Sequence, residues 1–271
     1  MFLGSVFSPY YFRARRRPDP PPAEEHAAFN CVLYRERGRI WTFTERGARH
    51  VERSEDGLRV GPSRASWDGH TLTVDLVERA CPVPSRVRGQ IRVELASTRA
   101  IDYPLDAAGR HHWRPIDPCA RVAVDFDRPD CRWRGHAYVD GNRGDRALET
   151  DFDGWDWCRL DGPGGGTRVF YDLRERGADP RTIALDFAAA GSATPAIAPK
   201  TAGLDGTGWR VARTVRSEGT ARVVRTLEDT PFYARSIVET RLEGEPVRGV
   251  HESLDLRRFG STWVQCLLPF R

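Results

Sequence analysis

A short stretch in the middle of the chain, Arg132 to Asp145 (RWRGHAYVDGNRGD), spaces three chemically active side chains two residues apart. Successive side chains of a β-strand point to opposite faces, so a strand here would carry His136, Tyr138 and Asp140 on one face. The glycines and the asparagine of Gly141–Gly144 that follow are typical of a turn. The stretch therefore predicts an imidazole, a phenol and a carboxyl side by side, just before a turn.

Two interpretations of this face are open. In the first, the strand end is solvated and Asp140 caps the turn through a local hydrogen bond. In the second, Asp140 lies in a pocket, where desolvation favours the protonated carboxyl and makes it a general acid near neutral pH. Tryptophans usually pack in cores, but their faces also stabilise cations. An acid beside such faces is what protonation of a carbon–carbon double bond requires. The tryptophans of this region are Trp113, Trp133, Trp155 and Trp157.

Other catalytic and metal-binding patterns are missing from the sequence. No Gly-x-Ser-x-Gly elbow of a serine hydrolase occurs. His111 and His112 are adjacent, but neighbouring side chains of a strand face opposite sides, which disfavours a shared metal ion. The cysteines form no CxxC pair, so we expect no metal site and scattered, reduced core thiols. The cysteines are Cys31, Cys81, Cys119, Cys131, Cys158 and Cys266.

The composition is that of a globular protein with a hydrophobic core. The chain has 271 residues, of which 39% are hydrophobic, and this length allows one large domain or two smaller ones. Lys200 is the only lysine, so nearly all of the 42 basic side chains are arginine, yet the formal net charge is only +4. No run of basic residues alternates with exposed aromatic residues, so a nucleic-acid partner is not expected.

The ends and the hydropathy of the chain predict a cytoplasmic protein. No apolar run approaches the ~20 residues needed to span a bilayer. The N-terminal arginines follow the short apolar segment, which is the reverse of a secretory signal.

Short alternating segments recur along the chain and predict an all-β fold. They are rich in Val, Ile, Thr, Phe and Tyr and are bounded by Gly, Pro, Asp or Asn. Such spacing favours an antiparallel sandwich or barrel. Gly141 to Gly154 has little strand character and is predicted to be a crossover between two barrels. Trp155–Trp157 is predicted to be the first strand of the second barrel, and Asp161–Gly166 is predicted to be a hairpin tip. The predicted strands are Arg39–Glu45, Thr71–Glu78, Gln90–Leu95, Arg121–Asp127, Thr167–Arg174, Thr182–Phe187, Ala221–Leu227 and Phe232–Leu242.

Stretches that span nearly the whole chain, in order, resemble the carotenoid 1,2-hydratases (hydroxyneurosporene synthases) of photosynthetic bacteria. The resemblance implies two lipocalin-like antiparallel β-barrels packed together with a pocket between or near them, which we place at residues 1–150 and 151–271. It implies addition of water across the terminal C1–C2 double bond of an acyclic carotenoid such as neurosporene or lycopene, and no cofactor. The stretches are Gly4–Tyr11 (GSVFSPYY), Phe43–Gly47 (FTERG), Gly109–Ile116 (GRHHWRPI), Gly135–Trp157 (GHAYVDGNRGDRALETDFDGWDW), Pro231–Ser236 (PFYARS), His251–Phe259 (HESLDLRRF) and Trp263–Phe270 (WVQCLLPF).

Carried over residue by residue, the resemblance places the catalytic acid on Asp140 and its supporting residues on His111, Trp113 and Tyr138. Asp140 would protonate C2, and the ring faces of Trp113 and Tyr138 would stabilise the cation at C1. Water would then add at C1 and lose its proton to Asp140 or by way of His111. The residues expected to bind the substrate are His136, Trp133, Trp155 and Trp157.

Some features depart from the family pattern, and alternatives stay open. His112, Gly141 and Arg143 are not the residues expected, and the chain stops at Arg271, where relatives continue slightly; these differences concern substrate preference more than the fold. A cyclase or isomerase of polyenes, a non-enzymatic carotenoid carrier and a structural or stress-related β protein are the alternatives.

The expected substrate is apolar and lives in lipid, which predicts peripheral docking at the inner or photosynthetic membrane. The sequence leaves open the preferred carotenoid, whether one or both ends react, and the oligomeric state. The side chains expected near anionic headgroups are Arg13, Arg15, Arg16 and Arg17.

Overall fold

The computed structural model describes residues 1–5, 8–96, 98, 101–189 and 191–268. More than half of these residues lie in β-strands, and the strand pairings with a described register are antiparallel. The longest α-helices in these ranges, α1 (Pro9–Ala14) and α4 (Thr262–Leu267), have 6 residues each. None of the helices described is long and apolar enough to cross a membrane. The prediction of an antiparallel all-β fold is confirmed, and closure into barrels stays a prediction.

The chain forms two compact units, and each unit combines separate stretches of sequence. The long strands β11 (His111–Arg128) and β12 (Asp130–Gly144) contribute residues to both. The two lipocalin-like barrels predicted at residues 1–150 and 151–271 stay a prediction. The first unit comprises Met1–Leu95, Ala120–Ala137 and Gln265–Arg271, and the second comprises Ala96–Cys119 and Tyr138–Val264.

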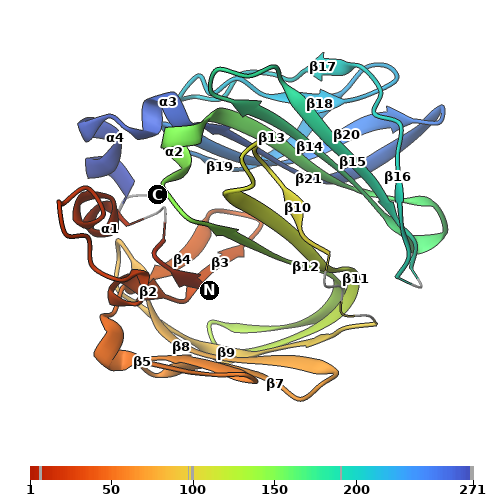
Figure 1. The fold of residues 1–271 in the computed structure, drawn as a ribbon. Helices are drawn as coiled ribbons and strands as arrows, with labels where there is room; N and C mark the ends of the chain where they lie inside the picture. Colours follow the sequence, from red (N-terminus) through yellow and green to blue (C-terminus); the bar gives the residue numbers. More distant parts are fainter. Residues whose placement is uncertain (6–7, 97, 99–100, 190, 269–271) are drawn as a thin grey trace. The chain divides into compact units, whose positions relative to one another are not determined.

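The first unit is built on a meander in which strands that follow one another in the chain also pair. β5 to β9 pair in sequence order, β4 joins β3 to β8, and the second half of β11 pairs with β9. Figure 1 shows β5, β7, β8 and β9 in shades of orange to yellow. Val60, Leu76 and Phe126 are among the buried side chains of this unit. The elements are β1 (Phe2–Leu3), η1 (Ala23–His26), β2 (Ala27–Ala28), β3 (Asn30–Tyr34), β4 (Arg39–Phe43), η2 (Ala48–His50), β5 (Val51–Ser54), β6 (Gly57–Val60), β7 (Ser63–Trp67), β8 (Thr71–Cys81) and β9 (Arg86–Glu94).

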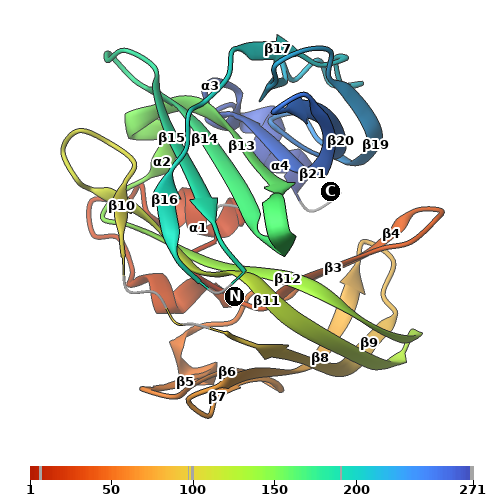
Figure 2. The same cartoon turned by 90° about the vertical axis from the view of Figure 1, so that its right-hand side faces the viewer.

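The second unit contains a seven-stranded sheet of order β16-β15-β14-β13-β21-β20-β19. Figures 1 and 2 show β13, β14 and β15 side by side in this sheet. β17 pairs with β18, and β10 pairs with the start of β11. The predicted hairpin tip is confirmed, because β13 and β14 pair across it. The elements are β10 (Tyr103–Pro104), β13 (Phe152–Asp161), η3 (Pro163–Gly165), β14 (Thr167–Glu175), β15 (Arg181–Phe187), β16 (Ala193–Pro195), β17 (Thr201–Gly203), β18 (Thr214–Arg216), β19 (Arg222–Asp229), β20 (Tyr233–Leu242), β21 (Glu245–Asp255) and α3 (Leu256–Phe259).

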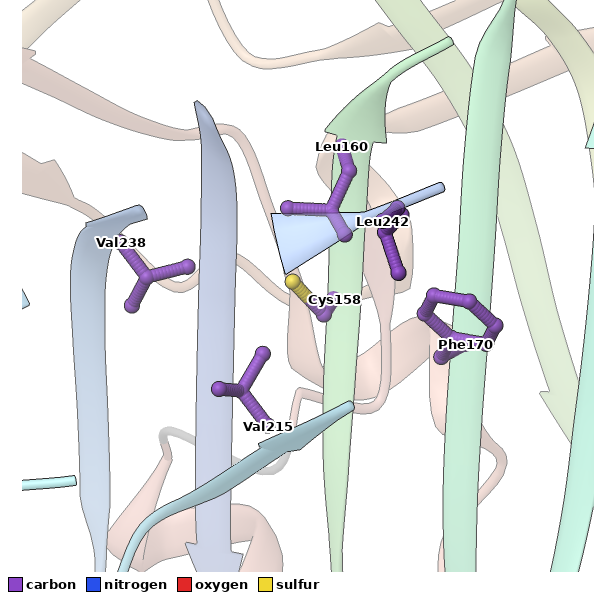
Figure 3. Close-up of a cluster of buried hydrophobic side chains, with 6 residues drawn as sticks. All are labelled: Cys158, Leu160, Phe170, Val215, Val238 and Leu242. Carbon is purple, nitrogen blue, oxygen red and sulfur yellow. The ribbon is translucent and has the colours of Figure 1, made fainter. Parts of the chain in front are cut away.

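Strand alternation gives the seven-stranded sheet two different faces. On one face an apolar cluster packs against β18, and Asp156 lies there with hydrogen bonds from Arg174 and Thr214. The residues between them in the chain, such as Trp155 and Trp157, point to the other face. Because the apolar cluster occupies one face of the sheet, the tryptophans must lie on the opposite face. Figure 3 shows its members, Cys158, Leu160, Phe170, Val215, Val238 and Leu242.

The segment after the GHAYVD motif differs from the sequence prediction. Gly141–Gly144 is not a turn, because β12 continues to Gly144. A Cβ atom on Gly144 would lie 2.4 Å from Nδ1 of His111, so this glycine serves a close approach within the strand instead of a change of direction. The connection to β13 contains one short helix, α2 (Leu148–Asp151). Both ends of the predicted crossover at 141–154 belong to the second unit, so it does not link the two compact units.

Candidate active site

The carboxyl of Asp140 is bound by an indole from the neighbouring strand. Nε1 of Trp113, on β11, donates a hydrogen bond to Oδ2 of Asp140, on β12, at 2.9 Å. Trp113 is 0% exposed and packs against the ring of Tyr103, with centroids 5.5 Å apart, so its donor is held in place. Asp140 lies inside a strand and not before a turn. The interpretation of Asp140 as a turn cap is therefore wrong.

The surroundings of Asp140 favour its neutral form. Loss of solvation raises its pKa from an ordinary 3.8 to about 6, against the hydrogen bond from Trp113, which lowers it. The charge of Glu252 raises the pKa further, and Tyr138 and Arg235 lower it. The residue nevertheless has exposed surface. A carboxyl can have exposed surface and a raised pKa when solvent reaches one of its edges and protein surrounds the rest. We infer that substrate can reach Asp140 through the exposed edge and that the surrounding protein raises its pKa.

Tyr138 shares a strand face with Asp140 and has a buried hydroxyl close to that carboxyl. Its ring meets that of Trp157 edge-on, with centroids 5.3 Å apart, and the Arg159 guanidinium lies 5.7 Å from its centroid. Oη makes no hydrogen bond of normal geometry within the described ranges, although it lies close enough to lower the pKa of Asp140. Burial, followed by the charge of Asp140, raises the pKa of Tyr138 well above 10, so the phenol stays neutral.

Tyr171 belongs to the same aromatic group, and the sequence did not single it out. It lies on β14 as the cross-strand partner of Trp157. Its ring meets those of Trp113 and Trp155 edge-on, at centroid distances of 5.7 Å and 6.0 Å. Burial, and then the charges of Asp140 and Glu252, raise its pKa well above 10. The strand itself was predicted, but no local signal gives its register against β13.

An ion pair continues this row of side chains across the sheet. Glu252 on β21 is the cross-strand partner of both Trp157 and Arg235. Nη2 of Arg235 lies 3.1 Å from Oε1 of Glu252, and their side chains are 33% and 23% exposed. The row Tyr171, Trp157, Glu252 and Arg235 thus crosses β14, β13, β21 and β20 on one face. Glu252 and Arg235 fall within the HESLDLRRF and PFYARS motifs, but neither was expected at the site.

His111 is joined to a different carboxyl. It shares a face of β11 with Trp113, yet its Nε2 donates to Oδ2 of Asp151 at 2.8 Å. Arg146 also binds Asp151, and this hydrogen bond is the main cause that lowers the pKa of Asp151. His111 is 1% exposed, and its Nδ1 has no partner among the residues that the structure describes. The expected supporting residues thus divide: Trp113 and Tyr138 lie at Asp140, and His111 is hydrogen-bonded to Asp151.

Comparison with known proteins identifies the family of this site. The whole chain, residues 1–271, matches the family model described as carotenoid hydratase CrtC. The chain belongs to the carotenoid hydratase family. It is 50% identical over 272 residues to the acyclic carotenoid 1,2-hydratase of Thiocapsa roseopersicina, which covers 99% of this chain and 67% of that protein. The prediction from the sequence motifs is confirmed.

Two further relatives carry the same name. The acyclic carotenoid 1,2-hydratase of Rubrivivax gelatinosus is 44% identical over 273 residues, covering 100% of this chain and 67% of that protein. That of Cereibacter sphaeroides is 39% identical over 273 residues, covering 100% and 95%. A solved structure from Nitrosomonas europaea, of a candidate AttH protein, matches with a TM-score of 0.48 and 12% identity over 84% of this chain and 85% of that chain. This last likeness is too weak to bear on the fold.

The residues expected to bind the carotenoid lie in both units. Trp155 and Trp157 are each 8% exposed and belong to the aromatic group of the second unit. His136 and Trp133 belong to the first unit, and both are exposed, Trp133 to 49%. Binding of substrate by these residues stays a prediction. Val6, Phe7, Pro269 and Phe270 of the family motifs lie outside the described residues.

The cysteines and the metal-binding side chains add no further site. All six cysteines are free, but only Cys158 is buried, so the prediction of core thiols is correct for Cys158 alone. In the described ranges, no group of three or more His, Cys, Asp or Glu side chains is placed to hold a metal ion.

Proposed function

We propose that this protein is an acyclic carotenoid 1,2-hydratase, which adds water across the terminal C1–C2 double bond of neurosporene, lycopene or a derivative. The observation that carries the proposal is the carboxyl of Asp140, which accepts the hydrogen bond of Trp113 beside aromatic rings and whose pKa is raised to about 6 by loss of solvation. Such a group is partly protonated near neutral pH and is a competent proton donor. Membership in the carotenoid hydratase family and the names of the relatives support the substrate class.

In this mechanism Asp140 donates its proton to C2, and a tertiary cation forms at C1. The faces of Trp113 and Tyr138 stabilise the cation, by up to ~2 kcal/mol each when desolvated, and Trp157 and Tyr171 extend the aromatic surface. Trp113 keeps its hydrogen bond to the carboxylate that Asp140 becomes, which offsets part of the cost of a charge among rings. Water then captures C1. No electrons are transferred, so the proposed reaction needs no redox cofactor.

The substrate also suggests where the protein works. Acyclic carotenoids dissolve in bilayers, so we propose peripheral association with the inner or photosynthetic membrane from the cytoplasmic side. The Arg13–Arg17 segment is the proposed contact, because arginines near an anionic surface gain about 1 kcal/mol each.

Expression in a host that accumulates lycopene or neurosporene tests the function. A pigment heavier by the mass of one water per reacted end is the expected product. A pigment of altered structure but equal mass would show a cyclase or isomerase, and unaltered pigment that co-purifies with the protein would show a carrier. Either result would overturn the hydratase proposal.

A further inference from the structure

Hydration of the C1 cation releases a proton from the attacking water, and a base must accept it. Asp140 has just become a carboxylate, but it lies on the side from which C2 was protonated. His111, the other residue considered from the sequence, is already hydrogen-bonded to Asp151 at 2.8 Å. The seven-stranded sheet carries another carboxyl near the aromatic group, on Glu252.

Glu252 and Asp140 approach the same aromatic group from different strands. Glu252 is the cross-strand neighbour of Trp157, and the ring of Trp157 meets that of Tyr138 at 5.3 Å. Tyr138 precedes Asp140 by two residues on one strand face. The two carboxyls are close enough for the charge of Glu252 to raise the pKa of Asp140 and of Tyr171. A contact between the rings of Tyr138 and Trp157 thus links the strand of Asp140 to the cross-strand neighbour of Glu252.

The two carboxyls have different polar partners. Nη2 of Arg235 lies 3.1 Å from Oε1 of Glu252 and forms an ion pair with it. Asp140 makes no ion pair with an arginine in the part of the chain that the structure describes, and its bond from Trp113 does not prevent a raised pKa. Two carboxyls with such different partners at a single site can divide the roles of general acid and general base.

Two buried polar atoms beside these carboxyls are not fully satisfied by the protein, although Oη of Tyr138 is close enough to Asp140 to lower its pKa. Nε1 of Trp157 and Oη of Tyr138 make no hydrogen bond of normal geometry to any described residue. Buried polar groups of native proteins are almost always satisfied by protein or by ordered water. An indole N–H can donate to a water oxygen, a phenol can donate or accept, and the carboxylate of Glu252 can accept the proton of that water.

We propose that Glu252 is the base that accepts the proton of the attacking water, and that Trp157 and Tyr138 hold this water. The inference rests on the hydration proposed above. As the O–H bond of Asp140 breaks, the C2–H bond forms. The water oxygen then bonds to C1 while one of its O–H bonds breaks and the proton passes to Glu252. Return of that proton to Asp140, directly or through solvent, completes the cycle, so that alkene and water give a tertiary alcohol.

Glu252→Gln tests the inference, because the amide keeps the size of the side chain but cannot accept the proton. We expect kcat for lycopene hydration to fall about 10²- to 10⁴-fold with little change in KM. Glu239→Gln is the matched control. Glu239 is also paired with arginines, Arg222 and Arg248, and lies four residues from Arg235, about 13 Å along the strand. Its kcat should stay within about twofold of the unmodified protein, the scatter expected when no general base is lost.

Rescue by azide separates the base from the acid. In Glu252→Ala the shorter side chain leaves room for azide, which attacks C1 without needing a base, so we expect a 1-azido product by mass spectrometry. Asp140→Asn should give no such product, because the cation does not form. Hydration by Glu252→Gln at the unmodified rate, or a folded Glu252→Ala that azide does not rescue, would overturn the inference.

Two controls keep the outcomes separate. If circular dichroism shows that the Glu252 variants are unfolded, Trp157→Phe replaces them as the test. This change keeps an aromatic ring but removes Nε1–H, and it should lower kcat without raising KM. An unchanged kcat would then overturn the inference. If the unmodified protein makes no hydrated product at all, the proposed function itself fails. If it hydrates lycopene and Glu252→Gln does so equally well, only the role of Glu252 is lost.

Discussion

Trp113 and Asp140 are joined across β11 and β12 by a single hydrogen bond, 2.9 Å from Nε1 to Oδ2. An indole N–H only donates, so it binds the carboxylate form of Asp140 more strongly than the neutral form. This bond lowers the pKa that desolvation raises, and the balance is a pKa of about 6. Asp140 is therefore neutral often enough to donate a proton, and its conjugate base is stabilised once it has done so.

Asp140→Asn should abolish hydration while leaving the fold intact. Asparagine keeps the size and can still accept the Trp113 hydrogen bond, but it has no acidic proton. We expect kcat to fall by about 10²- to 10⁴-fold, the usual contribution of a general acid, with pigment still bound. Product analysis by mass spectrometry measures the first effect and pigment co-purification the second. Asp102→Asn, at a carboxyl held by Arg114, is the control and should remain active. Near-normal hydration by Asp140→Asn would place the acid elsewhere.

The rate should depend on pH through the protonation of Asp140. Because the neutral carboxyl is the donor and its pKa is raised to about 6, kcat should decline as pH rises above about 6, approaching tenfold per pH unit. The charged and titratable groups that act on Asp140 include Glu252, Arg235 and Tyr138. Initial rates with lycopene in detergent, from pH about 5 to about 8, measure this decline. A rate that is flat over this range contradicts the assignment of Asp140 as the acid.

Much of the fold was predictable because strand alternation is a local property. The predicted strands Thr167–Arg174 and Thr182–Phe187 differ by only one residue at an end from β14 and β15. The error at Gly141–Gly144 has a different origin. Glycine is typical of turns, but Gly144 is required where a side chain from β11 approaches the strand. Only the packed structure distinguishes these two uses of glycine.

The site was predictable in part. Strand alternation singled out Asp140 and Tyr138, the resemblance to the carotenoid hydratase family gave a role to Trp113, and the structure brings these three side chains together. Tyr171 and Glu252 were missed because each reaches the site through its register against Trp157. Register between distant strands depends on the packing of whole faces, and no short stretch of sequence encodes it.

Trp113→Phe should shift the pH dependence of the rate. The change removes the N–H that lowers the pKa of Asp140, so the decline in kcat should move to higher pH. The loss of a hydrogen bond to a charged group, about 1.5–3 kcal/mol, should lower kcat by about 10- to 100-fold. Trp155→Phe is the control, because Trp155 packs against Tyr171 but does not bond to Asp140. If the decline stays in place in Trp113→Phe, the indole does not set the acidity of Asp140.

His111→Ala should act mainly on stability. The change removes one donor from the buried carboxylate of Asp151, which keeps Arg146, and we expect a loss of about 1–3 kcal/mol in the free energy of unfolding. Urea unfolding measures it. The effects of His111→Ala and Asp151→Asn should not add in the double variant, because the two residues share one interaction. Full stability combined with a displaced pH–rate profile would instead put His111 in the path of the proton.

The arginines in and just after α1 should control binding to anionic membranes. Arg13, Arg16 and Arg17 are exposed, and the guanidinium of Arg16 lies 3.8 Å from the centroid of the Phe12 ring. Each arginine near an anionic surface gains about 1 kcal/mol, so changing Arg13, Arg15, Arg16 and Arg17 to Gln should weaken flotation with anionic liposomes at least about tenfold. Raised salt should weaken binding of the unmodified protein in the same way. Zwitterionic liposomes are the control for charge.

Hydration of detergent-solubilised lycopene should be unchanged, because these side chains are not part of the Asp140 site. Unchanged flotation of the variant would show that another surface binds the membrane.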